Sequence, residues 1–544
     1  MSREYDYIVV GAGSAGCVLA NRLSADAGNR VLLLEAGSRD TNYLFRLPML
    51  MGKLMHSGIY NWKYHTEPEP NLAGRAVYWP RGKVLGGSST INGMIYVRGN
   101  RADYDGWEAL GLPGWSYKDV LPYFKRSEGH VDRDDAYHAG QGELTVQRSR
   151  AQNPMYDAFI EAGQQAGYAF TDDFNGAGQE GFGRYDFTIR NGKRCSAATA
   201  FLAPARARKN LAVVTNALAH RIIFSGMRAT GVVYRAGGKL VEVRAEKEII
   251  LAAGVVNSPQ LLLLSGIGDA EELGRHGIPV VQHLPGVGKN VQDHVDCCLV
   301  YECTQPLSLY NDLRMDKVAL GIIQASLLGT GFITTFPYEA GSFMKSSAGL
   351  AAPDLQTHFM PATEASANLH WSLPFARRQE TAANHGLTIR VGPLDPGSRG
   401  SIALRSADPS DPPLIRANYL AHERDLETTI AGIQLMRAVV AQQAFAGVRG
   451  RELAPGPAYQ SDKQLADWLV DAAMTTLHPV GSCKMGNDAA AVVDAQLRVH
   501  GVQGLRVADA SIMPAITRGN TNAPTIMIAE QASDMILERR LEDN

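Results

Sequence analysis

The chain begins with an alternation of apolar runs and a glycine-rich turn. Residues 5–10 form a short apolar run with β-branched side chains, which favours a strand buried on both faces. A glycine turn follows at residues 11–16, residues 17–23 have helical composition, and residues 30–35 read as a second strand. This order predicts the start of a parallel, doubly wound sheet.

Two further runs with the same buried pattern lie far downstream, at residues 248–254 and 505–509. We therefore expect a Rossmann-like α/β domain that is assembled from separated segments, namely residues 1–155, 196–295 and 468–544. Between them, residues 355–359 alternate in polarity and residues 393–400 are rich in turn formers. This pattern predicts an inserted α+β substrate domain, residues 156–195 and 296–467, with an antiparallel sheet and helices. A last helix is expected at residues 524–540.

The longest apolar stretch, residues 318–336, is interrupted by polar residues and glycines and is followed by Pro337. A membrane-spanning helix needs about 20 predominantly apolar residues. We expect a loop and a buried helix here in preference to contact with a membrane surface. The first residues lack the pattern of a secretory signal, so a cytoplasmic location is expected.

Composition narrows the class of function. The 544 residues carry a formal charge of -2, so nothing favours nucleic acid or an acidic membrane surface as a partner. The six cysteines form no CxxC pair. We expect them to pack as small apolar side chains, with no zinc site and no disulfide framework.

The turn at residues 11–16 has the GxGxxG spacing of a dinucleotide site. Gly11 permits a tight turn, Gly13 lets the backbone approach a pyrophosphate, and Gly16 allows close packing of helix and strand. Glu35 ends the next strand and would accept hydrogen bonds from ribose hydroxyls. A structural glycine turn is the alternative, and the motif does not distinguish FAD from NAD.

Four longer segments carry a resemblance. Residues 81–94, 254–268, 478–486 and 519–525 resemble, in this order, the signature and catalytic segments of the glucose–methanol–choline (GMC) oxidoreductases. The overall sequence pattern is similar to that of the choline dehydrogenase and alcohol dehydrogenase branch of this family. Val255 departs from the small residue usual at its place.

The resemblance implies FAD as the cofactor, and hence that the Rossmann-like domain binds FAD. Some relatives carry a histidine joined covalently to the flavin, and this chain has Ile91 at the matching place, so we expect non-covalent FAD. The residues expected to contact the cofactor are Gly11, Gly13, Ser14, Gly16, Glu35, Ala36, Arg81, Gly82, Val84, Gly86, Gly87, Ser88, Asn92, Gly93, Met94, Ala219, Asp509, Ala510, Thr521 and Asn522.

The catalytic residues follow from the same resemblance and from the chemistry of alcohol oxidation. Removing a proton from the hydroxyl requires a base, and a histidine has a pKa of about 6.5, close to working pH. His478 is the predicted base and Asn520 the predicted donor to the substrate oxygen, with Asn522 as the alternative partner. His294 lies in a family-like stretch and is expected to be structural.

The substrate itself is less well defined. Arg399 and Arg405 could bind an anion, although solvated turns explain them as well. An aromatic cage for a quaternary amine could draw on Trp62, Trp371, Phe375 and Glu364, so choline stays open.

These observations predict an FAD-dependent enzyme that oxidises an alcohol to an aldehyde or ketone. The electron acceptor would be a quinone, an artificial dye or oxygen, and quinone reduction would place the protein at the inner membrane as a peripheral protein. An oxygen-using oxidase and a hydroxynitrile-lyase-type flavoprotein are the alternatives on the same scaffold. An NAD-dependent dehydrogenase would leave residues 81–94 and 478–486 unexplained, and the oligomeric state stays open.

Overall fold

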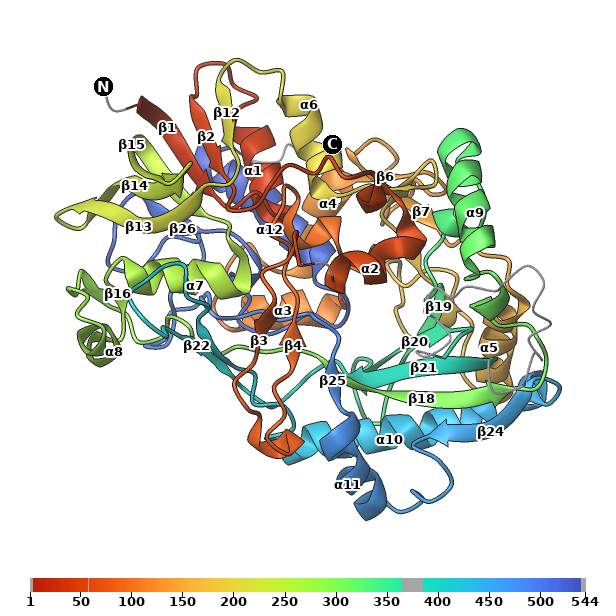
Figure 1. The fold of residues 1–544 in the computed structure, drawn as a ribbon. Coiled ribbons are helices and arrows are strands. Elements are labelled where there is room, and N and C mark those ends of the chain that lie inside the picture. The colour runs from red at the N-terminus through yellow and green to blue at the C-terminus, as the bar shows by residue number, and fades with distance from the viewer. Residues whose placement is uncertain (1–2, 57, 364–384, 540–544) are drawn as a thin grey trace.

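The computed structural model describes residues 3–56, 58–363 and 385–539 (Figure 1). The first large sheet combines strands from distant parts of the chain. Its parallel strands lie in the order β12 (Leu211–Val214), β2 (Val31–Leu34), β1 (Arg3–Val10) and β15 (Lys239–Leu251), and β26 (Leu505–Val507) also pairs with β15 in parallel. The predicted α/β sheet of separated segments is thus confirmed. An antiparallel hairpin, β13 (Leu218–Ser225) and β14 (Arg228–Ala236), extends it.

Two helices from opposite ends of the sequence pack against this sheet and each other. They are α1 (Ser14–Leu23) and α12 (Asn522–Leu537), and their apolar residues belong to one core with β1 and β2. Two predicted boundaries were wrong. The strand predicted to reach residue 254 ends at Leu251, because Gly254 already begins α7 (Gly254–Leu264). The last helix ends at Leu537, where Glu538 adopts a left-handed conformation (φ 53°).

The second large sheet is antiparallel, as the alternating pattern predicted. Its order is β24 (Arg449–Ala454), β18 (Val295–Cys303), β21 (Gly386–Pro393), β20 (Leu355–Met360), β19 (Ala340–Met344) and β8 (Gly181–Arg184). Helices α5 (Pro154–Gln165) and α10 (Glu423–Val440) cover one face, where a separate apolar core lies. On the other face, His358 of β20 and Arg390 of β21 line a cleft that also reaches Val10 of β1 and Leu34 of β2.

The apolar stretch after residue 314 forms α9 (Met315–Leu328), which projects at one side of the molecule in Figure 1. The prediction of a buried helix was wrong in part. Val318, Gly321 and Ala325 are buried, whereas the outer face exposes Leu320, Ile323, Leu327 and Leu328 by 56–78%. Among the described residues, no helix is both long and apolar enough to cross a membrane. The six cysteines are buried thiols, which confirms their predicted packing role.

Candidate active site

A single cleft runs from the glycine turn of the first sheet to the polar face of the second. At its inner end, Gly11 (φ 99°) and Gly16 make the turn between β1 and α1. A Cβ at Gly16 would lie 1.8 Å from the carbonyl oxygen of Gly11, so no larger side chain fits this turn. The N-terminus of α1 consequently approaches the cleft, and Gly13 and Ser14 line it.

Glu35 follows β2 and lies beside this turn. Its carboxylate accepts hydrogen bonds from the backbone N–H of Ala12 (2.9 Å) and of Gly37 (2.7 Å). Burial raises the pKa of Glu35 to about 7, although both backbone hydrogen bonds lower it. The side chain lines the cleft together with Ala36 and Ala219.

A second glycine loop, preceding and including the short helix η4 (Gly87–Thr90), lies against the first. Gly87 has a φ of 53°, and a Cβ there would stand 2.7 Å from the Cα of Gly13. Further along, Asn92 accepts hydrogen bonds from the Met94 N–H (3.1 Å) and from buried Arg194 (2.7 Å). Two backbone loops with little side-chain bulk therefore border one space.

Most of the predicted cofactor residues line this cleft. Those that do are Gly11, Gly13, Ser14, Glu35, Ala36, Arg81, Gly82, Gly87, Ser88, Asn92, Gly93, Met94, Ala219, Asp509, Ala510, Thr521 and Asn522. Gly16, Val84 and Gly86 lie behind its wall: Gly16 in the turn, Val84 packed with Phe45, and Gly86 bonded through its N–H to the carbonyl of Ala12.

Asp509 follows strand β26 and connects this segment to the start of α7 through hydrogen bonds. Its carboxylate accepts hydrogen bonds from the Gly254 N–H (2.8 Å), the Ser258 hydroxyl (2.6 Å) and the Ser511 N–H (2.8 Å). The side chain is thus used by the protein itself, and it fixes the turn that Ala510 continues at the edge of the cleft.

The predicted catalytic pair meets at the other end of the cleft. His478 Nε2 lies 3.0 Å from Asn520 Nδ2, and both residues line the cleft. Asn522 instead begins α12 and accepts a hydrogen bond from the Ser14 hydroxyl (2.7 Å) beside the glycine turn. Asn520 is therefore the asparagine next to His478.

A second histidine stands behind His478. His294 Nδ1 lies 3.1 Å from His478 Nδ1, and the two rings are perpendicular. His294 Nε2 lies 3.1 Å from the carbonyl oxygen of Leu394, and the Thr476 hydroxyl is 3.0 Å from His478 Nδ1. No sequence pattern indicated this contact, because residues 294 and 478 are far apart in the chain.

The backbone of His478 is held by a buried carboxylate. Asp293 accepts hydrogen bonds from the His478 N–H (2.8 Å), the Thr475 hydroxyl (2.6 Å) and the Tyr419 hydroxyl (2.5 Å). Pro479 follows His478, and Leu477 before it adopts a φ of 67°. These constraints fix where the ring points.

Burial holds the pKa of His478 well below its usual range, and His294, His358 and Arg81 lower it further. The pKa of His294 is lowered to about 4, chiefly by burial. His478 is consequently a neutral imidazole at neutral pH, which is the form that can accept a proton.

Sequence reasoning missed several cleft residues, and proposed others that lie elsewhere. His358 on β20, Arg390 on β21, Phe336 and Tyr338 line the cleft, and His358 and Arg390 lie close enough to His478 to lower its pKa. Neither Arg399 nor Arg405 is among the lining residues; Arg399 bonds to local carbonyls, and Arg405 pairs with Glu67. Trp62 lines the cleft, whereas Trp371, Phe375 and Glu364 fall outside the described residues.

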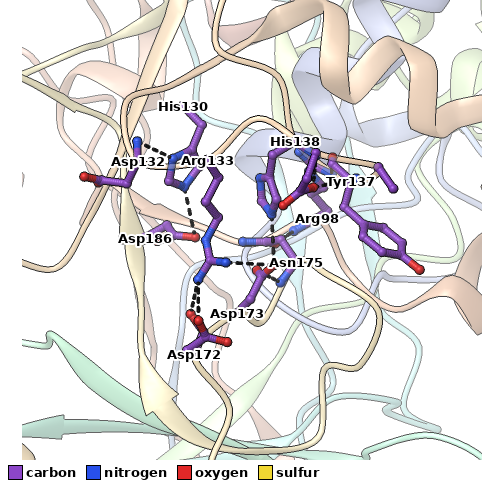
Figure 2. A network of polar contacts seen from close by, with 12 residues as sticks. Arg98, His130, Asp132, Arg133, Tyr137, His138, Asp172, Asp173, Asn175 and Asp186 are labelled. Atoms are coloured by element: carbon purple, nitrogen blue, oxygen red, sulfur yellow. Dashed lines mark hydrogen bonds and ion pairs between the residues drawn. The ribbon is translucent and has the colours of Figure 1, made fainter.

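A separate buried polar network lies outside the cleft (Figure 2). His138 lies between two carboxylates: Nδ1 is 3.1 Å from Glu128 and Nε2 is 3.0 Å from Asp173. Arg98 pairs with Glu128 (2.8 Å), and Arg133 pairs with Asp172. Burial lowers the pKa of His138, but hydrogen bonds to Asp173 and Glu128 outweigh it and raise the pKa to about 9.

Comparison with known proteins identifies the family. Sequence profiles described as GMC oxidoreductase match residues 5–296 and 396–529. The chain belongs to the GMC oxidoreductases. It is 45% identical to an oxygen-dependent choline dehydrogenase of Brucella anthropi over 541 residues, which cover 98% of this chain and 96% of that protein. It is 46% identical to the mitochondrial choline dehydrogenase of Homo sapiens, over 98% of this chain and 90% of that protein.

Solved GMC structures share the fold. A crystal structure of pyridoxine 4-oxidase from Mesorbium loti superimposes with a TM-score of 0.87 at 31% identity, covering 98% of this chain and all of that one. The chain is an FAD-dependent oxidoreductase that acts on an alcohol.

Proposed function

We propose that His478 is the base that takes the hydroxyl proton of the alcohol, and that Asn520 donates a hydrogen bond to the same oxygen. The observation that carries this proposal is the convergence of His478 Nε2 and Asn520 Nδ2, 3.0 Å apart in the cleft. A substrate oxygen that reaches one of them is within reach of the other.

The hydrogen-bond chain behind His478 supports the required tautomer. A carbonyl oxygen only accepts, so His294 Nε2 carries a proton and donates it to Leu394. Neutral His294 then has an unprotonated Nδ1, which accepts from the Nδ1–H of His478. His478 Nε2 is left with its lone pair toward the cleft. His294 is thus a positioning residue for the base.

The reaction follows from this arrangement. His478 Nε2 accepts the hydroxyl proton, while Asn520 stabilises the negative charge that develops on the oxygen. A single donor of this kind contributes about 100-fold or more to the rate in enzymes where it has been removed. Gln356 donates to Asn520 Oδ1 (3.3 Å) and so orients the Nδ2 group toward His478. FAD, when bound, supplies the hydride acceptor.

The cleft residues fit FAD held without a covalent bond. The α1 N-terminus and the two glycine loops suit a pyrophosphate, and the buried Glu35 suits a ribose. Directly after η4, Ile91 is a buried aliphatic side chain with no nucleophilic atom. Acid precipitation of the protein should release all of the yellow colour into the supernatant; colour in the pellet would contradict a non-covalent mode.

For the electron acceptor, we propose a lipid-soluble quinone reached at a membrane surface on the cytoplasmic side. Support comes from the outer face of α9, where Leu320, Ile323, Leu327 and Leu328 are exposed together. Leu327→Glu should abolish sedimentation with liposomes and lower quinone reduction, but leave reduction of a water-soluble dye unchanged. Equal sedimentation of the wild-type protein and Leu327→Glu would rule out the outer face of α9 as the membrane-binding surface.

The reaction itself is tested by mixing the purified flavoprotein with alcohols in the absence of oxygen. The panel would include aliphatic alcohols, benzyl alcohol, choline, hydroxy acids and polyols. Bleaching of the flavin absorbance by some of them is expected. If the flavin stays oxidised with every alcohol while a cyanohydrin is cleaved, the protein is a lyase and the proposal fails.

A further inference from the structure

The polar face of the second sheet presents a cation to the substrate end of the cleft. Arg390 on β21 lies directly opposite Cys298 of β18 on one side and His358 of β20 on the other. Side chains opposite each other in an antiparallel sheet share a face. Arg390 and His358 both line the cleft that contains His478.

Arg390 is fixed on its inner edge. Its Nε and Nη2 donate to the two carboxylate oxygens of Asp296 at 2.7 and 2.9 Å, and Nη2 also contacts the carbonyl of Thr475 (3.2 Å). Within the described part of the chain, Nη1 has no hydrogen-bond partner. Asp296 therefore holds the guanidinium in one orientation, and the N–H donors of Nη1 can bind a ligand.

The two charges are not equally accessible. The side chain of Arg390 is 21% exposed, whereas that of Asp296 is 2% exposed behind it. A molecule in the cleft thus meets the cation first. An accessible guanidinium edge is suited to planar oxygen acceptors, above all a carboxylate.

The other charged residues that line the cleft do not cancel the positive charge of Arg390. Among the described lining residues, the carboxylates are Glu35 and Asp509. Glu35 lies beside the glycine turn, and Asp509 is occupied by three donors. At the His478 end, Arg81 is a second lining cation, with its Nη2 bonded to the carbonyl of Leu477 (2.9 Å).

We propose that Arg390 determines specificity: it selects alcohols that carry a carboxylate away from the hydroxyl and disfavours alcohols with a quaternary ammonium group. This inference rests on the alcohol oxidation proposed above and names its substrate class. The carboxylate binds the free N–H edge of Arg390, and the hydroxyl lies between His478 and Asn520. A quaternary ammonium would bring a cation against a cation, and the described residues offer it no accessible carboxylate at this end.

The test compares kcat/KM for ω-hydroxy acids of increasing chain length, their methyl esters, choline and its uncharged isostere dimethylbutanol. For the wild-type holoenzyme we expect the best hydroxy acid to exceed its ester and choline by about 100-fold, the loss typical of a missing charge-assisted contact. Arg390→Met should remove this advantage and raise the relative use of choline, because the cation is gone while the negative charge of Asp296 remains.

A second variant keeps the test decisive if the single substitution disturbs folding. The double variant Arg390→Met with Asp296→Asn leaves neither charge, so the hydroxy acid should lose its advantage while choline gains nothing. Wild-type enzyme that oxidises choline as well as or better than every hydroxy acid would overturn the proposal, as would an unchanged ratio in Arg390→Met. If dimethylbutanol and all other alcohols fail to bleach the flavin, the proposed reaction itself fails, which is a distinguishable outcome.

Discussion

His294 Nδ1 and His478 Nδ1 lie 3.1 Å apart, and this contact decides which nitrogen of His478 faces the substrate. Two nitrogen atoms at this distance share one proton. Because His294 donates its own proton from Nε2 to the carbonyl oxygen of Leu394, the proton between the two Nδ1 atoms belongs to His478. The Nε2 lone pair of His478 is then available in the cleft.

Replacing His294 with phenylalanine should slow flavin reduction about 10- to 100-fold, since His478 can then adopt the wrong tautomer. KM should change little because His294 does not line the cleft. Stopped-flow absorbance measures the rate. Thr476→Val removes the other group near His478 Nδ1 and is the matched comparison. A normal rate in His294→Phe would show that Thr476 alone sets the tautomer.

Asn520 and Asn522 should differ in the kind of defect they cause. Asn520→Ala removes the donor beside His478 and should lower the rate of flavin reduction about 100-fold with FAD content intact. Asn522→Ala loses the contact with Ser14 near the glycine turn, so FAD retention should fall while the rate per bound flavin is kept. The reverse result would mean that the two asparagines exchange roles.

The pH dependence follows from the lowered pKa of His478. Burial disfavours its protonated form, as do the neighbours His294 and His358. The neutral form is the active base, so flavin reduction should stay level as the pH falls from about 8 to about 6.5, the usual pKa of histidine. A rate that halves near pH 6.5 would show that the site does not shift this pKa.

The network around His138 should make the stability of the fold depend on pH, with stability falling as the pH rises. The pKa of His138 is raised to about 9 in the folded protein, against about 6.5 when unfolded. Its protonated form stabilises the fold, so the contribution is complete below about pH 6.5 and is lost as the pH rises through about 9. His138→Gln should flatten the fall of Tm over this range, whereas His65→Gln, at an exposed site, should leave it unchanged.

The sequence predicted the large elements of the fold well because their patterns are local. The apolar runs at β1, β2 and β26 and the glycine turn each mark a buried strand or a tight approach of backbone. The exposed face of α9 was mispredicted since apolar composition alone does not show which side is covered. Its buried face is limited to Val318, Gly321 and Ala325.

The site was predictable only where chemistry coincides with a motif. His478 and Asn520 lie in such segments and meet as expected. Arg390 and His358 lie on ordinary-looking strands, and only the pairing of β20 with β21 brings them together in the cleft. The hypothesis of anion binding by Arg399 and Arg405 named turn arginines, whereas Arg390, which lines the cleft, is a strand residue.

The central claim, that His478 is the base, is tested most directly by mixing His478→Ala holoenzyme with the best alcohol under anaerobic conditions and following flavin absorbance. We predict that FAD content equals that of the wild type and that flavin reduction is slowed about 100- to 10,000-fold, the usual contribution of a general base. Reduction of the flavin in His478→Ala at the wild-type rate would contradict the account.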